Sequence, residues 1–156
     1  MKLESLLGIT MPKFGKQSLD RLATCHPDLQ KVMNEVIKRV DIVVIYGHRT
    51  VAEQAKIFAK GRKLVNGRWI KVGKTFTDKD GTINKSMHNY YPSKAIDIAK
   101  YPINWNDING FIELNDIVQE EAKKLGITLV WGADWDSDGN IAEHSLRDYP
   151  HFQIKG

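Results

Sequence analysis

The chain has 156 residues, of which 42% are hydrophobic, so it is long enough to bury one hydrophobic core. Cys25 is the only cysteine, which excludes an internal disulfide. The first ten residues hold no apolar run long enough for a signal peptide or a membrane span. We therefore expect one soluble, monomeric domain over residues 1–156 with no transmembrane segment.

The chain has a net charge of +4, with 23 basic residues interleaved among 19 acidic ones. This excess suits an anionic partner, and nucleic acid and the anionic cell envelope both qualify. The densest basic stretch, residues 60–74, has the composition of a solvated loop rather than of a recognition helix. We therefore do not expect nucleic-acid binding.

The first half of the chain predicts helices around one strand. Residues 18–23 are consistent with a short helix, and residues 28–40 have apolar side chains at helical spacing after Pro27. The β-branched run 42–45 predicts a buried strand. Thr50 and Glu53 have the spacing of a capping box, which predicts a helix from there to about Lys60.

The second half mixes strands with one long helix. Residues 61–85 lack helical periodicity, and Asn66-Gly67 and Asp80-Gly81 predict one or two hairpins. Residues 95–99 alternate like a half-buried strand, with Ala95 and Asp97 on one face. A helix is expected over 107–125, and strands over 127–131 and 152–154. This order predicts an α+β domain in which helices pack on a small, mainly antiparallel sheet.

Two of the five histidines, His88 and His151, have carboxylates nearby that suggest a metal site. A catalytic zinc ion takes three protein ligands and leaves one position for water, and His88, Asp97 and His151 supply such a set. Asp148, three residues before His151, is then placed to accept a proton from the water. Spacing alone leaves open a pairing of Asp97 with a lysine and a core role for His151.

The other three histidines have simpler explanations. His26 precedes Pro27 at a helix start, His48 neighbours Arg49, and His144 lies in an acidic loop. We expect capping, packing or surface roles for all three.

Two segments carry a resemblance to a known family. Ser86-Met87-His88 with Ala95-Ile96-Asp97, and later Asp148-Tyr149-Pro150-His151-Phe152, resemble the zinc D-alanyl-D-alanine carboxypeptidase family, which includes phage L-alanyl-D-glutamate endopeptidases. The resemblance extends from about residue 14 to residue 154. It implies that His88, Asp97 and His151 bind Zn²⁺ and that Asp148 is the catalytic base.

The resemblance also implies substrate contacts. Gly47-His48-Arg49-Thr50 resembles the segment of the family whose arginine contacts substrate near the reacting carbonyl, so Arg49 is a candidate catalytic and substrate-binding residue. Ser86 is a candidate substrate contact or support for a ligand, and a turn serine is its structural alternative. One departure concerns the loop beside the zinc: six residues, 89–94, separate His88 from Ala95 where the family motif has four, and the motif glycine is absent.

A second metal site is suggested by Asp134, Asp136, Asp138 and Gly139, which match the opening positions of a calcium loop. The closing glutamate of such a loop is absent, because Ser145 occupies that position. Binding of Ca²⁺ at Asp134, Asp136 and Asp138 and an acidic turn without an ion are therefore both open.

The resemblance implies a phage endolysin that hydrolyses the L-alanyl-D-glutamate bond of bacterial peptidoglycan and so lyses the cell. The alternatives are a D-alanyl-D-alanine carboxypeptidase or dipeptidase, and a non-catalytic wall-binding module with structural zinc. An endolysin without a signal peptide is expected to stay in the host bacterial cytoplasm until the membrane opens. It would then act on peptidoglycan in the periplasm.

Overall fold

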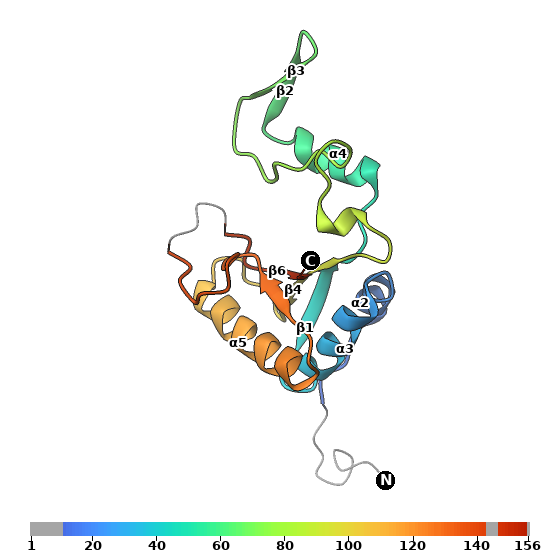
Figure 1. The fold of residues 1–156 in the computed structure, drawn as a ribbon, viewed down its shortest axis with the longest axis vertical. Helices are drawn as coiled ribbons and strands as arrows, with labels where there is room; N and C mark the ends of the chain where they lie inside the picture. The colour runs from blue at the N-terminus through green and yellow to red at the C-terminus, as the bar shows by residue number, and fades with distance from the viewer. Residues whose placement is uncertain (1–10, 143–146, 156) are drawn as a thin grey trace.

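The fold is the α+β arrangement that the sequence predicts. The computed structural model describes residues 11–142 and 147–155. Within them, a four-stranded antiparallel sheet has the strand order β1-β4-β6-β5, and β2 and β3 form a separate hairpin (Figure 1). The strands are β1 (Ile42–Tyr46), β2 (Arg62–Val65), β3 (Arg68–Lys71), β4 (Ala95–Lys100), β5 (Leu129–Trp131) and β6 (His151–Ile154).

Three helices enclose the core at one side of the four-stranded sheet: α2 (Lys16–Leu22), α3 (Pro27–Val36) and α5 (Ile108–Lys124). The apolar side chains of α3 and α5 meet those of the sheet and are almost completely buried; among them are Leu29, Val32, Met33, Leu114, Val118, Ile96, Ile98 and Phe152. Burial of this apolar surface is the main source of stability.

Helix α3 is shorter than predicted, because it ends at Val36 rather than at Val40. The Ile37 amide still donates to a carbonyl four residues back, but those of Lys38 and Arg39 donate to carbonyls three residues back, at Glu35 and Val36. Such bonds tighten the final turn and turn the chain toward β1.

The prediction that residues 95–99 form a half-buried strand is wrong in one respect, because β4 is buried on both faces. It is an inner strand, with β1 on one side and β6 on the other. One face places Ile96 and Ile98 in the core. The other face places Asp97 among polar side chains. The polar and apolar residues of β4 therefore alternate, but both kinds are buried.

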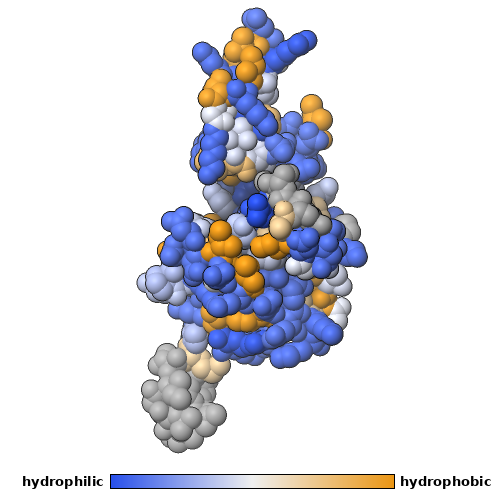
Figure 2. All heavy atoms as spheres, turned by 90° about the vertical axis from the view of Figure 1, so that its left-hand side faces the viewer, coloured by the Kyte–Doolittle hydropathy of each residue, from blue (hydrophilic) through white to orange (hydrophobic). Residues whose placement is uncertain are grey.

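Residues 51–85 form an arm that projects from the rest of the molecule (Figures 1 and 2). Helix α4 (Val51–Ala59) begins with the predicted capping box, in which the hydroxyl of Thr50 accepts from the amide of Glu53, and the Glu53 carboxylate accepts from that of Thr50. The hairpin turn at Asn66-Gly67 is also confirmed, with φ of 48° and 76°. In the described part of the chain, no helix is long and apolar enough to cross a membrane.

Candidate metal centre

The sheet and one short turn bring His88, Asp97 and His151 together. Asp97 of β4 lies directly opposite His151 of β6 in the strand register. His88 lies in the 3₁₀ turn η1 (Met87–Asn89) that precedes β4. His151 Nδ1 lies 3.1 Å from Asp97 Oδ1, His88 Nε2 lies 3.2 Å from the same oxygen, and the two nitrogens are 3.3 Å apart. All three side chains are buried.

The remaining ring nitrogen of each histidine determines which atom faces the centre. His88 Nδ1 donates to the carbonyl of Gly47 at 2.8 Å, and His151 Nε2 donates to Gln153 Oε1 at 2.8 Å. In the neutral rings, His88 Nε2 and His151 Nδ1 therefore present lone pairs to the Asp97 carboxylate. Three acceptors that converge in a buried place repel one another unless a cation or protons lie between them.

The spacing of these atoms suits a metal ion. Ligand bonds of about 2.0–2.1 Å in tetrahedral geometry place ligand atoms roughly 3.3–3.4 Å apart. The observed separations of 3.1–3.3 Å are close to this value. His88, Asp97 and His151 can therefore hold a small divalent ion. No lysine pairs with Asp97 in the described part of the chain, and Arg49 lies beside it instead.

The charges within the centre shift the pKa values of its members. Burial by itself would raise the pKa of Asp97, but the two histidines outweigh this effect and hold it well below its usual range. Burial by itself would lower the pKa of His151, but the hydrogen bond to Asp97 and the charges of Asp97 and Asp148 raise it above 6.5. The Asp97 carboxylate thus favours a proton on the neighbouring His151 ring.

Asp148 lies at the edge of the centre, with Oδ2 3.8 Å from His151 Nδ1. Burial and the negative charge of Asp97 raise the pKa of Asp148 to about 6. Its side chain still has 44% of its surface exposed, so the carboxylate remains open to water and substrate.

Gly132 positions Asp148 through a close backbone approach. The Gly132 carbonyl accepts from the Asp148 amide at 2.7 Å, and the Gly132 amide donates to the His151 carbonyl at 2.7 Å. A Cβ atom at Gly132 would lie within 3 Å of atoms of both Asp148 and His151. A larger residue there would displace the candidate base and a candidate ligand together.

Arg49 is buried behind the centre, with 7% of its surface exposed. Its Nη2 lies 3.7 Å from Asp97 Oδ2, and its guanidinium carbon lies 4.4 Å from the centre of the Tyr46 ring. Its Nε is buried and has no hydrogen-bond partner in the described part of the chain. Arg49 therefore offers a donor beside the centre and also compensates the charge of Asp97.

Two residues whose roles the sequence did not predict hold Arg49 in place. Gln54 Oε1 accepts from Arg49 Nη1 at 2.9 Å, and Asn89 Nδ2 donates to the Arg49 carbonyl at 3.0 Å. Gln54 is fully buried and also donates to the Lys79 carbonyl at 2.9 Å. The sequence pattern does not predict that Gln54 is buried. Its burial depends on the return of the chain near Lys79, which packs against α4.

Ser86 helps to position His88. Its hydroxyl accepts from the His88 amide at 3.2 Å, and its own amide donates to Asn89 Oδ1 at 2.8 Å. These bonds cap the turn that presents His88. Whether Ser86 also contacts substrate stays a prediction.

The long loop between His88 and Ala95 is anchored by Ser93, which is completely buried. The Ser93 amide donates to the Thr24 carbonyl at 2.8 Å, and its carbonyl accepts from the His26 amide at 2.8 Å. Its hydroxyl donates to the Ala95 carbonyl at 2.6 Å. The loop thus reaches the connection between α2 and α3 before it returns to β4.

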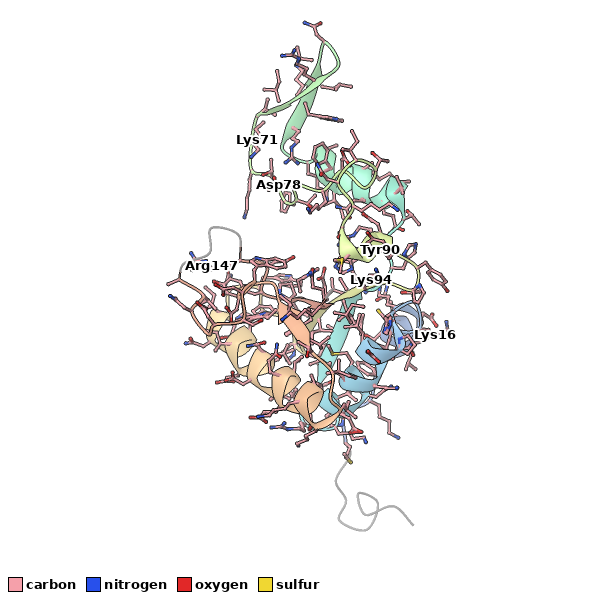
Figure 3. The ribbon with its side chains drawn as sticks, in the orientation of Figure 1. Lys16, Lys71, Asp78, Tyr90, Lys94 and Arg147 are labelled. Carbon is pink, nitrogen blue, oxygen red and sulfur yellow. The ribbon has the colours of Figure 1, made fainter. Side chains whose placement is uncertain are left out.

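The other histidines lie apart from the centre where the structure describes them. His26 caps α3, as expected, because its Nδ1 accepts from the Asp28 amide at 3.0 Å. His48 Nδ1 lies 2.9 Å from the Tyr90 carbonyl. Figure 3 shows Tyr90 and Lys94 at the junction between the arm and the core. His144 lies outside the described residues.

The second predicted cluster is also brought together. Carboxylate oxygens of Asp134, Asp136 and Asp138 lie within 4.8 Å of one another. Asp134 already accepts from the amides of Asp138 and Gly139, at 3.2 and 2.9 Å. Backbone amides thus satisfy part of the negative charge of this loop.

Metal affinity at the centre should fall as the pH falls. A proton on His151 competes with the metal for Nδ1, and a proton on Asp148 removes a nearby negative charge. Because the hydrogen bond and charge of Asp97 raise the pKa of His151 above its ordinary value, and the pKa of Asp148 is about 6, Zn²⁺ binding should be roughly tenfold or more weaker at pH 5.5 than at pH 7.5. Isothermal titration calorimetry with Zn²⁺ measures this change, and Asp148→Asn should make it shallower. An affinity that does not depend on pH would contradict the assignment of these ligands.

Comparison with known proteins identifies related peptidases. The chain is 35% identical over 140 residues, 86% of its length, to the L-alanyl-D-glutamate peptidase of Escherichia phage T5, of which 90% is covered. It is 30% identical over 129 residues, 75% of its length, to the peptidoglycan L-alanyl-D-glutamate endopeptidase CwlK of Bacillus subtilis (strain 168), of which 62% is covered.

A solved structure shares the fold. The crystal structure of the Serratia marcescens L-Ala D-Glu endopeptidase ChiX matches with a TM-score of 0.64 and 22% identity, over 92% of this chain and 90% of that one. The family model described as phage L-alanyl-D-glutamate peptidase matches residues 11–154. The chain therefore belongs to the phage L-alanyl-D-glutamate peptidase family.

Proposed function

We propose that this protein is a zinc-dependent peptidoglycan hydrolase, an endolysin that cleaves the L-alanyl-D-glutamate bond of the stem peptide. The observation that carries the proposal is the convergence of three lone-pair atoms, 3.1–3.3 Å apart, next to a half-exposed carboxylate. The names of the related proteins supply the bond and the polymer. The folded unit is proposed to be a single domain that acts as a monomer.

Zinc is the metal that this donor set suits best. Two imidazole nitrogens and one carboxylate oxygen form a mixed nitrogen and oxygen set, and three protein ligands leave a fourth position open. Magnesium and calcium prefer six or more oxygen ligands, which His88 and His151 do not offer. The two histidines are also oriented by hydrogen bonds to Gly47 and Gln153, as in zinc sites in general.

The chemistry divides between the metal and the side chains around it. A bound zinc ion would polarise the scissile carbonyl and favour deprotonation of water. Asp148, which is open to solvent and has a pKa raised to about 6, accepts the proton of the attacking water. It then returns that proton to the leaving D-glutamate amine as the carbon–nitrogen bond breaks. Arg49, which lies beside Asp97 and has a buried Nε without a partner among the described residues, would stabilise negative charge on the reacting carbonyl.

Replacing Asp148 tests this mechanism most directly. Asp148→Ala should retain zinc and lose about 100- to 10,000-fold in turnover, because the general base is removed and the three ligands stay. Mass spectrometry of digested peptidoglycan measures new free amino-terminal D-glutamate, and zinc content is determined on the same samples. Asp116→Ala, an exposed aspartate of α5, is the matched control and should behave like the wild type.

The same digestion distinguishes the alternatives. Release of D-alanine instead of new D-glutamate amines would indicate a D-alanyl-D-alanine carboxypeptidase or dipeptidase. Absence of cleavage by the zinc-loaded wild type, with retained binding to peptidoglycan, would indicate a wall-binding module with structural zinc.

The role proposed for Arg49 is tested by Arg49→Ala. If its guanidinium stabilises negative charge on the reacting carbonyl, turnover should fall about 100- to 1,000-fold with zinc content unchanged. The control is Arg39→Ala, since Arg39 is an exposed arginine that pairs with Glu120 at 2.8 Å far from the centre. Loss of zinc from the Arg49 variant would instead assign Arg49 to holding Asp97.

Calcium binding by Asp134, Asp136 and Asp138 stays a prediction. If the loop binds Ca²⁺, added calcium should raise the melting temperature and change the activity, because this loop leads to Asp148. Differential scanning fluorimetry and a turnover assay measure both effects. Asp136→Asn together with Asp138→Asn should abolish them, and no response of the wild type would exclude the site.

We also propose where the enzyme acts. The protein would remain in the host bacterial cytoplasm until another protein opens the membrane, and would then reach peptidoglycan in the periplasm.

A further inference from the structure

The arm has a charge unlike that of the rest of the chain. Residues 56–77 contain seven lysines and arginines and no aspartate or glutamate. This charge exceeds the net charge of the whole chain, +4, so the remainder is net acidic. The metal centre does not use any of these seven residues.

Among the described residues, most of these cations have no counter-charge. Arg62 pairs with Asp78 at 3.2 Å. The other six, Lys56, Lys60, Lys63, Arg68, Lys71 and Lys74, are exposed and form no ion pair with any described residue. Lys60 and Lys74 both lie near the Phe76 ring, at 5.9 and 5.8 Å from its centre, so two like charges share one exposed aromatic side chain. Figure 3 shows Lys71 on the outer part of the arm.

Apolar side chains are exposed on the same segment. Six of them lie within thirteen residues: Leu64 (56% exposed), Val65 (38%), Trp69 (48%), Ile70 (46%), Val72 (65%) and Phe76 (60%). In Figure 2 the arm shows hydrophobic and hydrophilic residues side by side at its far end. Such a concentration of exposed apolar surface marks an interaction site.

The pairing of β2 with β3 places basic and apolar side chains together on one face of the hairpin. Lys63 lies opposite Ile70, and Val65 lies opposite Arg68, so both pairs belong to one face of the hairpin. The other face has Leu64 opposite Trp69, and Trp69 packs edge-on against Phe58 of α4 at 5.6 Å. The first face therefore presents two cations and two aliphatic side chains to the surroundings.

We propose that residues 60–76, the outer hairpin segment, bind the surface of an anionic phospholipid membrane. A soluble polyanion would neutralise the lysines but would leave the aliphatic side chains in water. A bilayer with anionic headgroups satisfies both, because the cations meet phosphate while the apolar side chains enter the boundary with the acyl chains. This segment is distant from the catalytic residues in the fold, so the membrane contact does not depend on the proposed hydrolysis.

The direct test is sedimentation of the full chain with lipid vesicles. Vesicles of phosphatidylcholine with about 30% phosphatidylglycerol should bind the protein at least about tenfold more tightly than pure phosphatidylcholine, and added salt should weaken the binding. Equal binding to both vesicles, or binding to neither, would overturn the proposal.

Matched variants assign the binding to the hairpin. Lys63→Glu with Arg68→Glu should weaken vesicle binding at least tenfold. Lys31→Glu with Lys123→Glu changes the net charge equally at two exposed lysines of α3 and α5 and should change binding less than twofold. Equal losses from the two pairs would show that only the net charge matters, against the proposal.

A third pair separates a bilayer from a polyanion. Val65→Thr with Ile70→Thr keeps charge and β-branched shape and should weaken vesicle binding at least about threefold. Unchanged binding would mean that no apolar side chain enters the membrane, and retention of wild-type protein by isolated peptidoglycan but not by vesicles would assign the segment to the wall. Hydrolysis of a soluble stem peptide should stay within twofold of the wild type in all variants, which confirms that they are folded.

Discussion

The convergence of His88 Nε2, His151 Nδ1 and Asp97 Oδ1 in a buried place is the constraint on which the rest of the site depends. Three electron-rich atoms 3.1–3.3 Å apart are stable together only with a positive charge between them or beside them. Three neighbouring features can supply this positive charge. Arg49 lies beside Asp97, the charge of Asp97 favours a proton on His151, and a divalent ion fits the spacing.

The fold places these atoms by independent means. The pairing of β4 with β6 sets Asp97 opposite His151, and the Ser86 cap sets the turn that carries His88. Gly47 and Gln153 orient the two rings. Gly132 lets the chain bearing Asp148 approach closely. A metal centre built on two strands and a capped turn is held more rigidly than one built on loops, as catalysis by positioned groups requires.

Gln54 connects the centre to the arm. Its Oε1 accepts a hydrogen bond from Arg49 Nη1, and its Nε2 donates one to the Lys79 carbonyl. One buried amide therefore joins Arg49 to the loop that follows the hairpin. The arm therefore has a base held by buried hydrogen bonds and an outer segment that is basic and apolar. This difference is why we assign the base to support of the site and the outer segment to a separate contact.

Interactions between residues close in the sequence determine many of the local structures of this protein. The helical spacing of α3 and α5, the Thr50–Glu53 capping box, the Asn66-Gly67 turn and the cap at His26 are short-range features, and the structure confirms them. The motif residues also identified the family. What depends on contacts between distant segments needed the tertiary structure. Burial of both faces of β4 follows from its inner place in the sheet, burial of Gln54 from the return of the arm, and the exposed position of the basic hairpin from its projection beyond the core. Sequence patterns report the preferences of neighbouring residues, whereas burial and charge compensation depend on which distant side chains the fold brings into contact.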